Sequence, residues 1–355
     1  MIGVEWDISW HRSIGRDTFW TPPHMAIYLC GIIAGIASAY LILATTFGKL
    51  PEVRKSSVRM WGFYGPLGAF ITAWGGIAML VSAPFDDWWH SAYGLDVKIL
   101  SPPHMVLALG VNAIELGALI MILGNMNRAE DGARRLLNVL YLYVGSMLLV
   151  SMQVTTMEYS FRVFQHTGQF FVAMALAVPL VLIGVAAGSE NRWAATIMAA
   201  IYMLFMASLV WILPRFPAEP KLGPVFNPVT QFVPPNFPLL LILPAIAIDL
   251  LRGYFRERGV NVWVQAIGCG AAFFGVFFAT QWLFADFLVS PAAANPFFGT
   301  IYRDYGTPAT SLEGRGVFFG REANFVSLLV WAAAISMAAS RIGLGWGNWM
   351  RTVKR

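Results

Sequence analysis

Charged residues are scarce in this chain. Only 12% of its 355 residues are Asp, Glu, Lys or Arg, whereas 57% are hydrophobic and the mean hydropathy is +0.62. Because about a quarter of the residues in an ordinary soluble domain are charged, this composition excludes that class. Long apolar runs recur along the chain, and roughly 20 apolar residues suffice for a helix to cross a bilayer. The sequence therefore predicts an all-α, polytopic integral membrane protein.

Cysteines and nucleotide-binding motifs are also scarce. The two cysteines, Cys30 and Cys269, fall inside apolar runs, so we expect packing residues and neither a disulfide nor a CxxC site. The sequence contains no P-loop, no GxGxxG turn and no low-complexity tract. A cleavable signal peptide is not expected, because Asp7, His11 and Asp17 interrupt the region where its apolar core would lie.

The apolar runs predict about nine membrane-spanning helices, of which the seventh is the shortest. Their approximate ranges are 24–46, 61–83, 103–124, 136–157, 167–188, 192–213, 236–252, 262–287 and 323–345. Two loops, 214–238 and 290–325, are long, rich in proline or glycine and carry aromatic residues. Loops of this length usually have a function or are disordered, and we expect ordered caps over the outer face.

The net charge of +5 could suggest a nucleic-acid partner, but the basic residues gather in a few loops. These residues follow the first, third and seventh predicted spans and end the chain: Lys49, Arg54, Lys55, Arg59, Arg128, Arg134, Arg135, Arg252, Arg256, Arg258, Arg351, Lys354 and Arg355. All of these segments share one side of the membrane if the N-terminus is outside. The positive-inside rule thus predicts an extracytoplasmic N-terminus and a cytoplasmic C-terminus, with the lipid bilayer rather than nucleic acid as partner.

Loop 288–322 is the exception, because it is predicted outside despite three arginines. Long loops follow the positive-inside rule poorly, so the orientation stands. We expect the chain to lie in a bacterial inner (cytoplasmic) membrane.

Two stretches of the chain repeat one pattern of polar residues. They are "DISWHRSIGRDTFWTPPHM" at 7–25 and "DDWWHSAYGLDVKILSPPHM" at 86–105. In each, an aspartate precedes a histidine by four residues, a glycine and a second aspartate follow it, and Pro-Pro-His comes later. Four of the five histidines occupy these matched positions.

The spacing of the repeat suits metal binding. Residues i and i+4 share one face of a helix, so each Asp and His can point the same way. Thr21 and Ser101 are good N-cap residues, and the prolines after them suit the first helical positions. The sequence predicts one metal set at Asp7, His11 and His24 and a second at Asp86, His90 and His104. Asp17 and Asp96 would orient the imidazoles or complete the coordination.

The remaining ionisable residues have no such pattern. A single membrane histidine is usually a structural hydrogen-bonding residue, and His166, near Glu158, keeps that interpretation. Glu115, Asp249 and Asp286 lie within or near spans, where we interpret them as relay or packing residues. For the repeat itself, the alternative to metal binding is a helix cap duplicated for structural reasons.

Two imidazoles and a carboxylate suit copper, zinc or non-haem iron, and ligand type alone does not choose among these metals. Without a thiolate, a closed structural zinc site is not expected. Three protein ligands leave open coordination positions, as catalytic sites do.

The first stretch resembles a copper-binding signature of the copper membrane monooxygenases, the particulate methane and ammonia monooxygenase family, where it belongs to the C subunit. That signature runs Asp-x3-His-x12-His and includes the Trp-His, Arg-Asp-Thr and Thr-Pro-x-His sequences found at 10–11, 16–18 and 21–24. The resemblance implies one copper at Asp7, His11 and His24, and a second set with spacing x3 and x13 at Asp86, His90 and His104. Asp96 supplies the acidic residue that the family has six positions after the second set's first histidine.

The resemblance covers about 100 residues, from Asp7 to the third span, and departs from the family in several respects. Family members have asparagine at the position of Asp86, and membrane segments before the first signature. We therefore divide the chain into a C-subunit-like copper-binding region, 1–125, and a further membrane region, 126–355, that resembles nothing known to us. The implied partners are A-like and B-like monooxygenase subunits, one of them bearing cupredoxin domains.

Three functions follow from these observations. The first is a copper-dependent oxidoreductase, or a subunit of one, that uses O₂ to hydroxylate a small apolar substrate and takes electrons from a quinol or a redox partner. The alternative is a non-enzymatic copper-binding protein or a structural subunit of a larger membrane complex. Haem ligation by histidine pairs ranks third.

Overall fold

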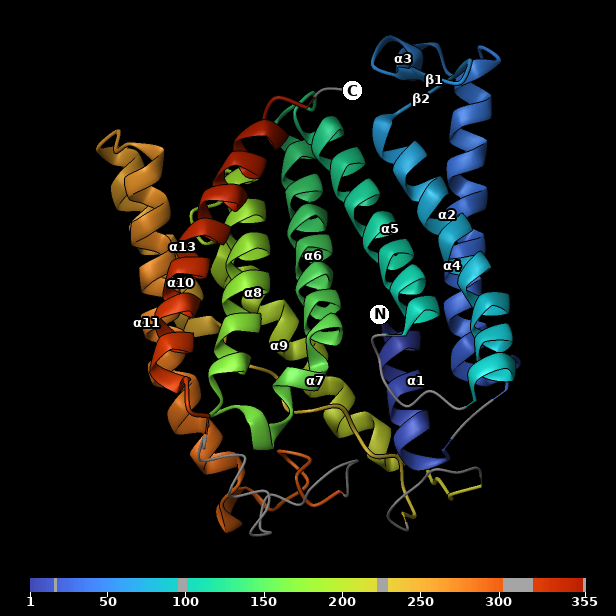
Figure 1. Ribbon diagram of the computed structural model, residues 1–355. Coiled ribbons are helices and arrows are strands. Elements are labelled where there is room, and N and C mark those ends of the chain that lie inside the picture. Colours follow the sequence, from blue (N-terminus) through green and yellow to red (C-terminus); the bar gives the residue numbers. More distant parts are fainter. Residues whose placement is uncertain (16–17, 95–100, 222–228, 303–321, 354–355) are drawn as a thin grey trace. The chain divides into compact units, whose positions relative to one another are not determined.

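The computed structural model describes residues 1–15, 18–94, 101–221, 229–302 and 322–353 (Figure 1). These residues form two compact units. The first unit comprises Met1–Val4, Thr18–Ser151 and Trp349–Arg355, and the second comprises Glu5–Asp17 and Met152–Asn348. Because most of the described residues are helical and their one sheet is a short two-stranded hairpin, the prediction of an all-α fold is confirmed.

Within the described residues, eight helices are long and apolar enough to cross a membrane. They are α2 (Pro22–Thr46), α4 (Leu67–Tyr93), α5 (Pro102–Met126), α6 (Asp131–Thr155), α8 (Gly168–Gly188), α9 (Ala194–Ile212), α11 (Val262–Leu288) and α13 (Phe325–Met350). The shorter helices are α1 (Ile2–Ser13), α3 (Pro51–Lys55), α7 (Met157–Ser160) and α10 (Ile242–Glu257), with 3-10 turns at Arg162–Phe164, Leu213–Arg215 and Pro291–Ala293. Eight such helices define a polytopic integral membrane protein.

The seventh predicted span, 236–252, is instead the 16-residue helix α10, which starts at Ile242 and is too short to cross a bilayer alone. Three prolines at 234, 235 and 238 keep the preceding backbone extended. Side chains of neighbouring helices accept its amide hydrogens: Leu239 N donates to Tyr202 Oη (3.1 Å) and Leu240 N to Gln281 Oε1 (3.0 Å).

The second predicted span, 61–83, begins and ends later than expected. Residues 58–65 form an antiparallel hairpin of β1 (Val58–Met60) and β2 (Phe63–Gly65), with Met60 opposite Phe63. Helix α4 therefore starts only at Leu67. It continues through Pro84 to Tyr93, which places Asp86 and His90 on the helix rather than in a loop.

In the first unit, α4 packs closely against α2 and α5 (Figure 1). Glycines permit the contact between α4 and α5. A Cβ on Gly117 would lie 2.2 Å from Thr72 Oγ1 and 2.5 Å from the Gly68 carbonyl oxygen, distances that no side chain tolerates. Small residues let helix backbones approach in this way in membranes. The close contact holds the last turns of α4 beside the first turn of α5.

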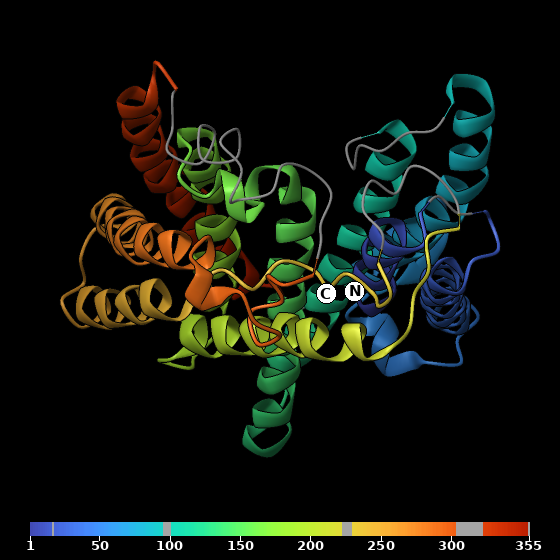
Figure 2. The ribbon, with the colours of Figure 1, turned by 90° about the horizontal axis from the view of Figure 1, so that it is seen from below.

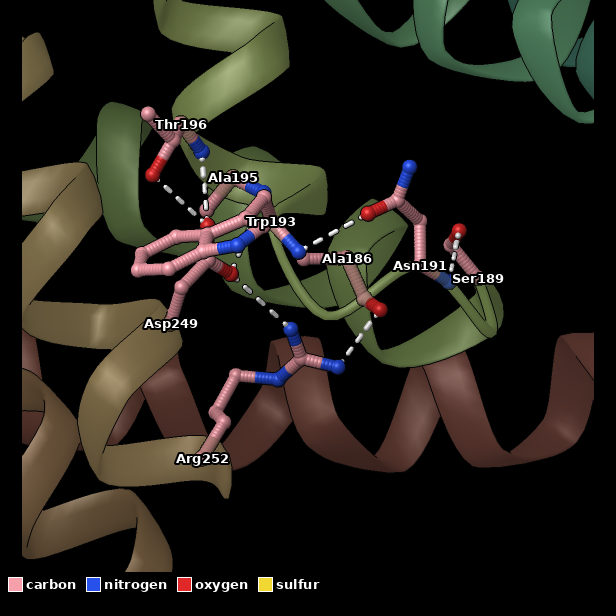
Figure 3. Close-up of polar contacts among 8 residues, drawn as sticks. All are labelled: Ala186, Ser189, Asn191, Trp193, Ala195, Thr196, Asp249 and Arg252. Carbon is pink, nitrogen blue, oxygen red and sulfur yellow. Dashed lines mark hydrogen bonds and ion pairs between the residues drawn. The ribbon is translucent and has the colours of Figure 1, made fainter. Parts of the chain in front are cut away.

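In the second unit, α8 is buried along most of its length, and α10 lies beside α11 (Figures 1 and 2). A polar cluster joins α8, α9 and α10 (Figure 3). Asp249 accepts hydrogen bonds from the backbone amides of Ala195 and Thr196, at 3.2 and 2.8 Å, and so caps α9. Arg252 lies 3.3 Å from Asp249 and donates to the carbonyl oxygen of Ala186 (2.6 Å) near the end of α8.

Candidate metal centre

The second predicted set of ligands lies where α4 ends and α5 begins, within the first unit. Asp86 and His90 occupy the last turns of α4, four residues apart on one face. His104 is in the first turn of α5, directly after Pro102 and Pro103. Ser101 holds the N-cap position that the sequence predicts, but its side chain makes no capping hydrogen bond. The two prolines thus start the helix, since their missing amide hydrogens need no partner there.

The carboxylate of Asp86 contacts both imidazoles. Its Oδ2 lies 3.1 Å from His90 Nε2, and its Oδ1 lies 3.6 Å from His104 Nε2. All three side chains are largely shielded from solvent, with exposed fractions of 19 to 30%. The fold therefore brings together, from two helices, the three side chains that the sequence predicts for this set. We call these three residues the Asp86 cluster.

Gly94, the glycine of the second repeat, both ends α4 and contacts His90. Gly94 ends α4 with a φ of 83°, a conformation that favours glycine. Its carbonyl oxygen lies 3.4 Å from His90 Nδ1. If Nδ1 carries the hydrogen that faces this carbonyl, Nε2 presents either a second hydrogen or a lone pair toward Asp86. A cation can occupy the space that such a lone pair faces, and a backbone carbonyl on the other ring nitrogen is a common outer partner of metal-bound histidine.

The Asp86 cluster contains imidazole and carboxylate groups, which are donor types that metal ions bind. Ligand atoms bound at about 2.0–2.2 Å lie roughly 3 to 3.5 Å from one another, close to the two distances observed. However, each imidazole faces a different oxygen of the carboxylate. Within the described part of the chain, no group of three or more His, Cys, Asp or Glu side chains, the Asp86 cluster included, is placed so that it could hold a metal ion. The cluster is thus a carboxylate between two imidazoles.

The first predicted set is divided between the two units. Asp7 and His11 lie four residues apart on α1 in the second unit, whereas His24 lies in the first turn of α2 in the first unit. Within its unit, the His24 ring packs 5.7 Å from the ring of Tyr28. This set stays a prediction. Asp17 and Asp96 lie outside the described residues.

The ionisable residues without a sequence pattern have polar partners. Asp249 caps α9, and Glu115 Oε2 accepts a hydrogen bond from Ser151 Oγ at 2.7 Å. Asp286 lies 3.6 Å from Nε2 of the buried His166. Burial lowers the pKa of His166 from 6.5 to about 4, against the opposing effect of Asp286, so this histidine is neutral at neutral pH.

Glu5 is a buried acidic residue that the sequence pattern does not single out. It lies on α1 and is only 2% exposed. Burial raises its pKa from 4.5 to about 7, although Arg12 on the same helix lowers it in part. Helix α1 is held in the second unit by Ser9 Oγ, which donates to the Val233 carbonyl oxygen, and Ser13 Oγ, which accepts from Val233 N. In the sequence, Glu5 is recognisable only as an acidic residue that lies on a different face of α1 from Asp7 and His11.

The last turns of α4 carry a group of aromatic side chains. Trp89 packs on Tyr93 with ring centroids 4.5 Å apart, and Trp88 stacks on Phe85 at 6.0 Å. Trp88 and Tyr93 are more than half exposed. Such rings are typical of the boundary between membrane and water, which indicates that the Asp86 cluster lies near a membrane surface.

The fold and this site together define an all-α polytopic membrane protein with a two-histidine, one-carboxylate cluster at the end of two helices. No family model matches the chain, and no curated protein or solved structure is detectably similar to it. The resemblance to the monooxygenase family therefore rests on the two sequence motifs.

Proposed function

We propose that this chain is a copper-binding membrane protein and that Asp86, His90 and His104 hold one copper ion. The observation that carries the proposal is the position of the Asp86 carboxylate, within 3.1 and 3.6 Å of two imidazole nitrogens from different helices. Imidazole and carboxylate ligands suit copper. The motif resemblance favours copper over zinc and iron.

By the same resemblance, the activity we propose is O₂-dependent hydroxylation of a small apolar substrate, with electrons from a quinol or another donor. Copper at the site would supply the redox chemistry. The chain itself would supply the two imidazoles, the carboxylate and the orientation of His90 by the Gly94 carbonyl. A-like and B-like subunits are the partners proposed for this activity.

We also propose that the N-terminus is outside and the C-terminus cytoplasmic, as the distribution of basic residues favours. Because eight helices of the described residues are long enough to span a membrane, this orientation requires a ninth crossing, which we assign to the extended residues before Ile242 together with α10. The Asp86 cluster would then lie near the extracytoplasmic face of a bacterial inner membrane. Asp7, His11 and His24 are proposed as a second copper set on the same side.

One observation favours a structural alternative. Each imidazole of the Asp86 cluster has its own carboxylate oxygen, so the cluster can also join α4 to α5 without a metal. In that case the chain would be a non-enzymatic membrane protein or a structural subunit of a larger complex.

Metal analysis distinguishes the two functions. The protein is purified in mild detergent, and its copper is measured by elemental analysis and by electron paramagnetic resonance. We expect one copper per intact set, with a nitrogen-coordinated Cu(II) signal. His90→Ala and His104→Ala should each raise the Kd for copper by more than roughly 100-fold, because even outer partners of metal ligands contribute 10–100-fold.

Asp87→Asn is the matched control for Asp86→Asn, because it removes the same charge one residue away. Copper should survive the substitution at Asp87 and fall with that at Asp86. His24→Ala should remove the signal of the first set alone. Protein without copper, or with metal that none of these substitutions affects, would leave the structural alternative.

A further inference from the structure

The segment between α2 and α4 has an unusual combination of exposed side chains. Residues 47–66 contain α3 and the β1–β2 hairpin, with four basic residues and a single acidic one. Phe47 and Trp61 are 74% and 73% exposed, and Phe63 is 41% exposed. Because α2 and α4 are both candidate membrane spans, this segment lies at a boundary between membrane and water.

The hairpin is firmly attached to the end of α2. Thr46 Oγ1 donates to the Tyr64 carbonyl oxygen (3.2 Å) and accepts from Tyr64 N (2.8 Å). Arg54 donates to the Thr46 carbonyl oxygen at 2.8 Å and stacks over the Tyr64 ring at 4.1 Å. Val58 and Met60 pack against the core of the first unit. The exposed side chains are therefore held on a fixed support.

Trp61 occupies a strained position at the tip of the hairpin. Its φ is 49°, and among the described residues it is the only non-glycine residue with a positive φ. With Gly62 at 89°, it forms a two-residue turn in which Asn or Gly is the usual first residue. Its ring contacts the half-exposed Trp74, edge to face at 5.6 Å. A tryptophan is unfavourable at a positive φ, and its exposed ring adds little to the packing of the hairpin. This combination indicates that Trp61 interacts with something outside the chain.

The basic side chains of the segment differ in whether they pair with other groups of the protein. Lys55 pairs with Glu52 at 2.7 Å, and Arg54 caps α2. Lys49 and Arg59 are exposed on either side of these groups, and Arg59 lies 5.7 Å from the Tyr64 ring. The segment carries a net charge of +3. Basic side chains beside exposed aromatic rings are complementary to a lipid bilayer, whose headgroup layer can be anionic and whose interior is apolar.

We propose that this hairpin is a binding site for anionic phospholipid headgroups, with Trp61 inserted into the interfacial layer and Lys49 and Arg59 on the phosphate groups. Indole rings settle at the headgroup level of bilayers, and basic side chains near the surface attract anionic lipids. The hairpin and the Asp86 cluster lie at opposite ends of α4, so this site is separate from the proposed copper centre.

Lipid composition provides the first test. The full chain is placed in nanodiscs of phosphatidylcholine alone or of an equal mixture with phosphatidylglycerol, and thermal unfolding is followed by circular dichroism. The mixture should raise the unfolding midpoint at low salt. Lys49→Gln with Arg59→Gln lowers the net charge of the segment and should abolish most of this rise.

The matched control is Glu52→Gln with Lys55→Gln, which also removes two charges but leaves the net charge unchanged. This pair should keep the full rise. A rise that is absent from the unsubstituted protein, or that both pairs reduce equally, would overturn the proposal.

The second test locates the tip of the hairpin in the bilayer. A nitroxide is attached at Trp61→Cys in a Cys30→Ala background, since the buried Cys269 is not accessible to the reagent. In vesicles of the same mixture, collisions with oxygen should exceed collisions with a water-soluble nickel chelate, and the same label at Ser57→Cys serves as the comparison. A label at position 61 that meets mainly the nickel chelate would show that the tip lies in water and overturn the proposal.

Discussion

At the scale of single residues, the chain buries a few ionisable side chains, such as Glu5. A buried carboxyl such as Glu5 resists ionisation because the protein interior solvates charge poorly. Its pKa of about 7, against 4.5 for an exposed glutamate, means that the folded chain keeps a proton that the unfolded chain has lost between these two pH values. Folding stability should therefore fall as the pH rises from about 4.5 to 7.

Glu5→Gln should remove this loss of stability. A shift of this size corresponds to about 3 kcal/mol, so the variant should be more stable than the unsubstituted protein at pH 8 by up to that amount and no more stable at pH 4.5. Unfolding midpoints in detergent across this range provide the measurement. Equal pH dependence of the two proteins would contradict the prediction.

Two details bear on that comparison. The low pKa of His166 acts in the opposite direction, since it makes stability rise with pH between about 4 and 6.5. Both proteins share this effect, so their difference at each pH isolates Glu5. Glu52→Gln is the control, because the Glu52 side chain is 79% exposed and should contribute little.

The residue pattern predicted much of the candidate site. The spacing of Asp86, His90 and His104 predicted that they would meet, and the first two do so simply because residues i and i+4 share a helical face. The contact with His104 crosses between two helices. The partner of His90 at Gly94 was not predicted, because a backbone carbonyl leaves no mark of its own in the sequence.

At the scale of elements, the Asp86 cluster depends on how closely α4 and α5 approach. Gly68, Gly75, Gly110 and Gly117 provide this approach, and each sits against backbone or side-chain atoms of the other helix. A side chain at any of these positions would push the helices apart. The separation of Asp86 from His104 would then grow, whereas that of Asp86 from His90 would not.

Gly117→Val should therefore lower the unfolding midpoint and weaken copper binding together. Overpacking of this kind costs about 1–3 kcal/mol. The control is Gly35→Ala on α2, because an added Cβ there meets no atom within 4 Å. A Gly117→Val protein with the stability and copper content of the unsubstituted chain would show that α4 and α5 can accept a larger side chain between them, and would contradict the prediction.

The boundaries of elements were predicted less well than their existence. Hydropathy placed the second span at 61–83, but the turn at Trp61 and Gly62 makes a hairpin of its first residues. Hydropathy also merged the extended residues before Ile242 with α10. Both errors arise because apolarity measures burial in lipid or protein, and it does not distinguish a helix from an apolar strand or an extended segment.

At the scale of the whole molecule, the orientation in the membrane remains a prediction from charge. Thr18 and Lys49 are both exposed and flank α2, so they should lie on opposite sides of the membrane. In a Cys30→Ala background, an impermeant maleimide should label Thr18→Cys on intact cells. It should label Lys49→Cys only after lysis, and the reverse pattern would invert the proposed topology.

The sequence alone determined the class of this protein, because composition and run length govern whether a chain prefers lipid to water. It also predicted which residues form the Asp86 cluster, because a repeated spacing can be recognised without knowledge of the fold. Tertiary structure decided which apolar runs become full spans, and that His104 reaches Asp86. These outcomes depend on contacts between residues far apart in the chain, such as Tyr202 with Leu239 and Gly117 with Gly68, which no local pattern encodes.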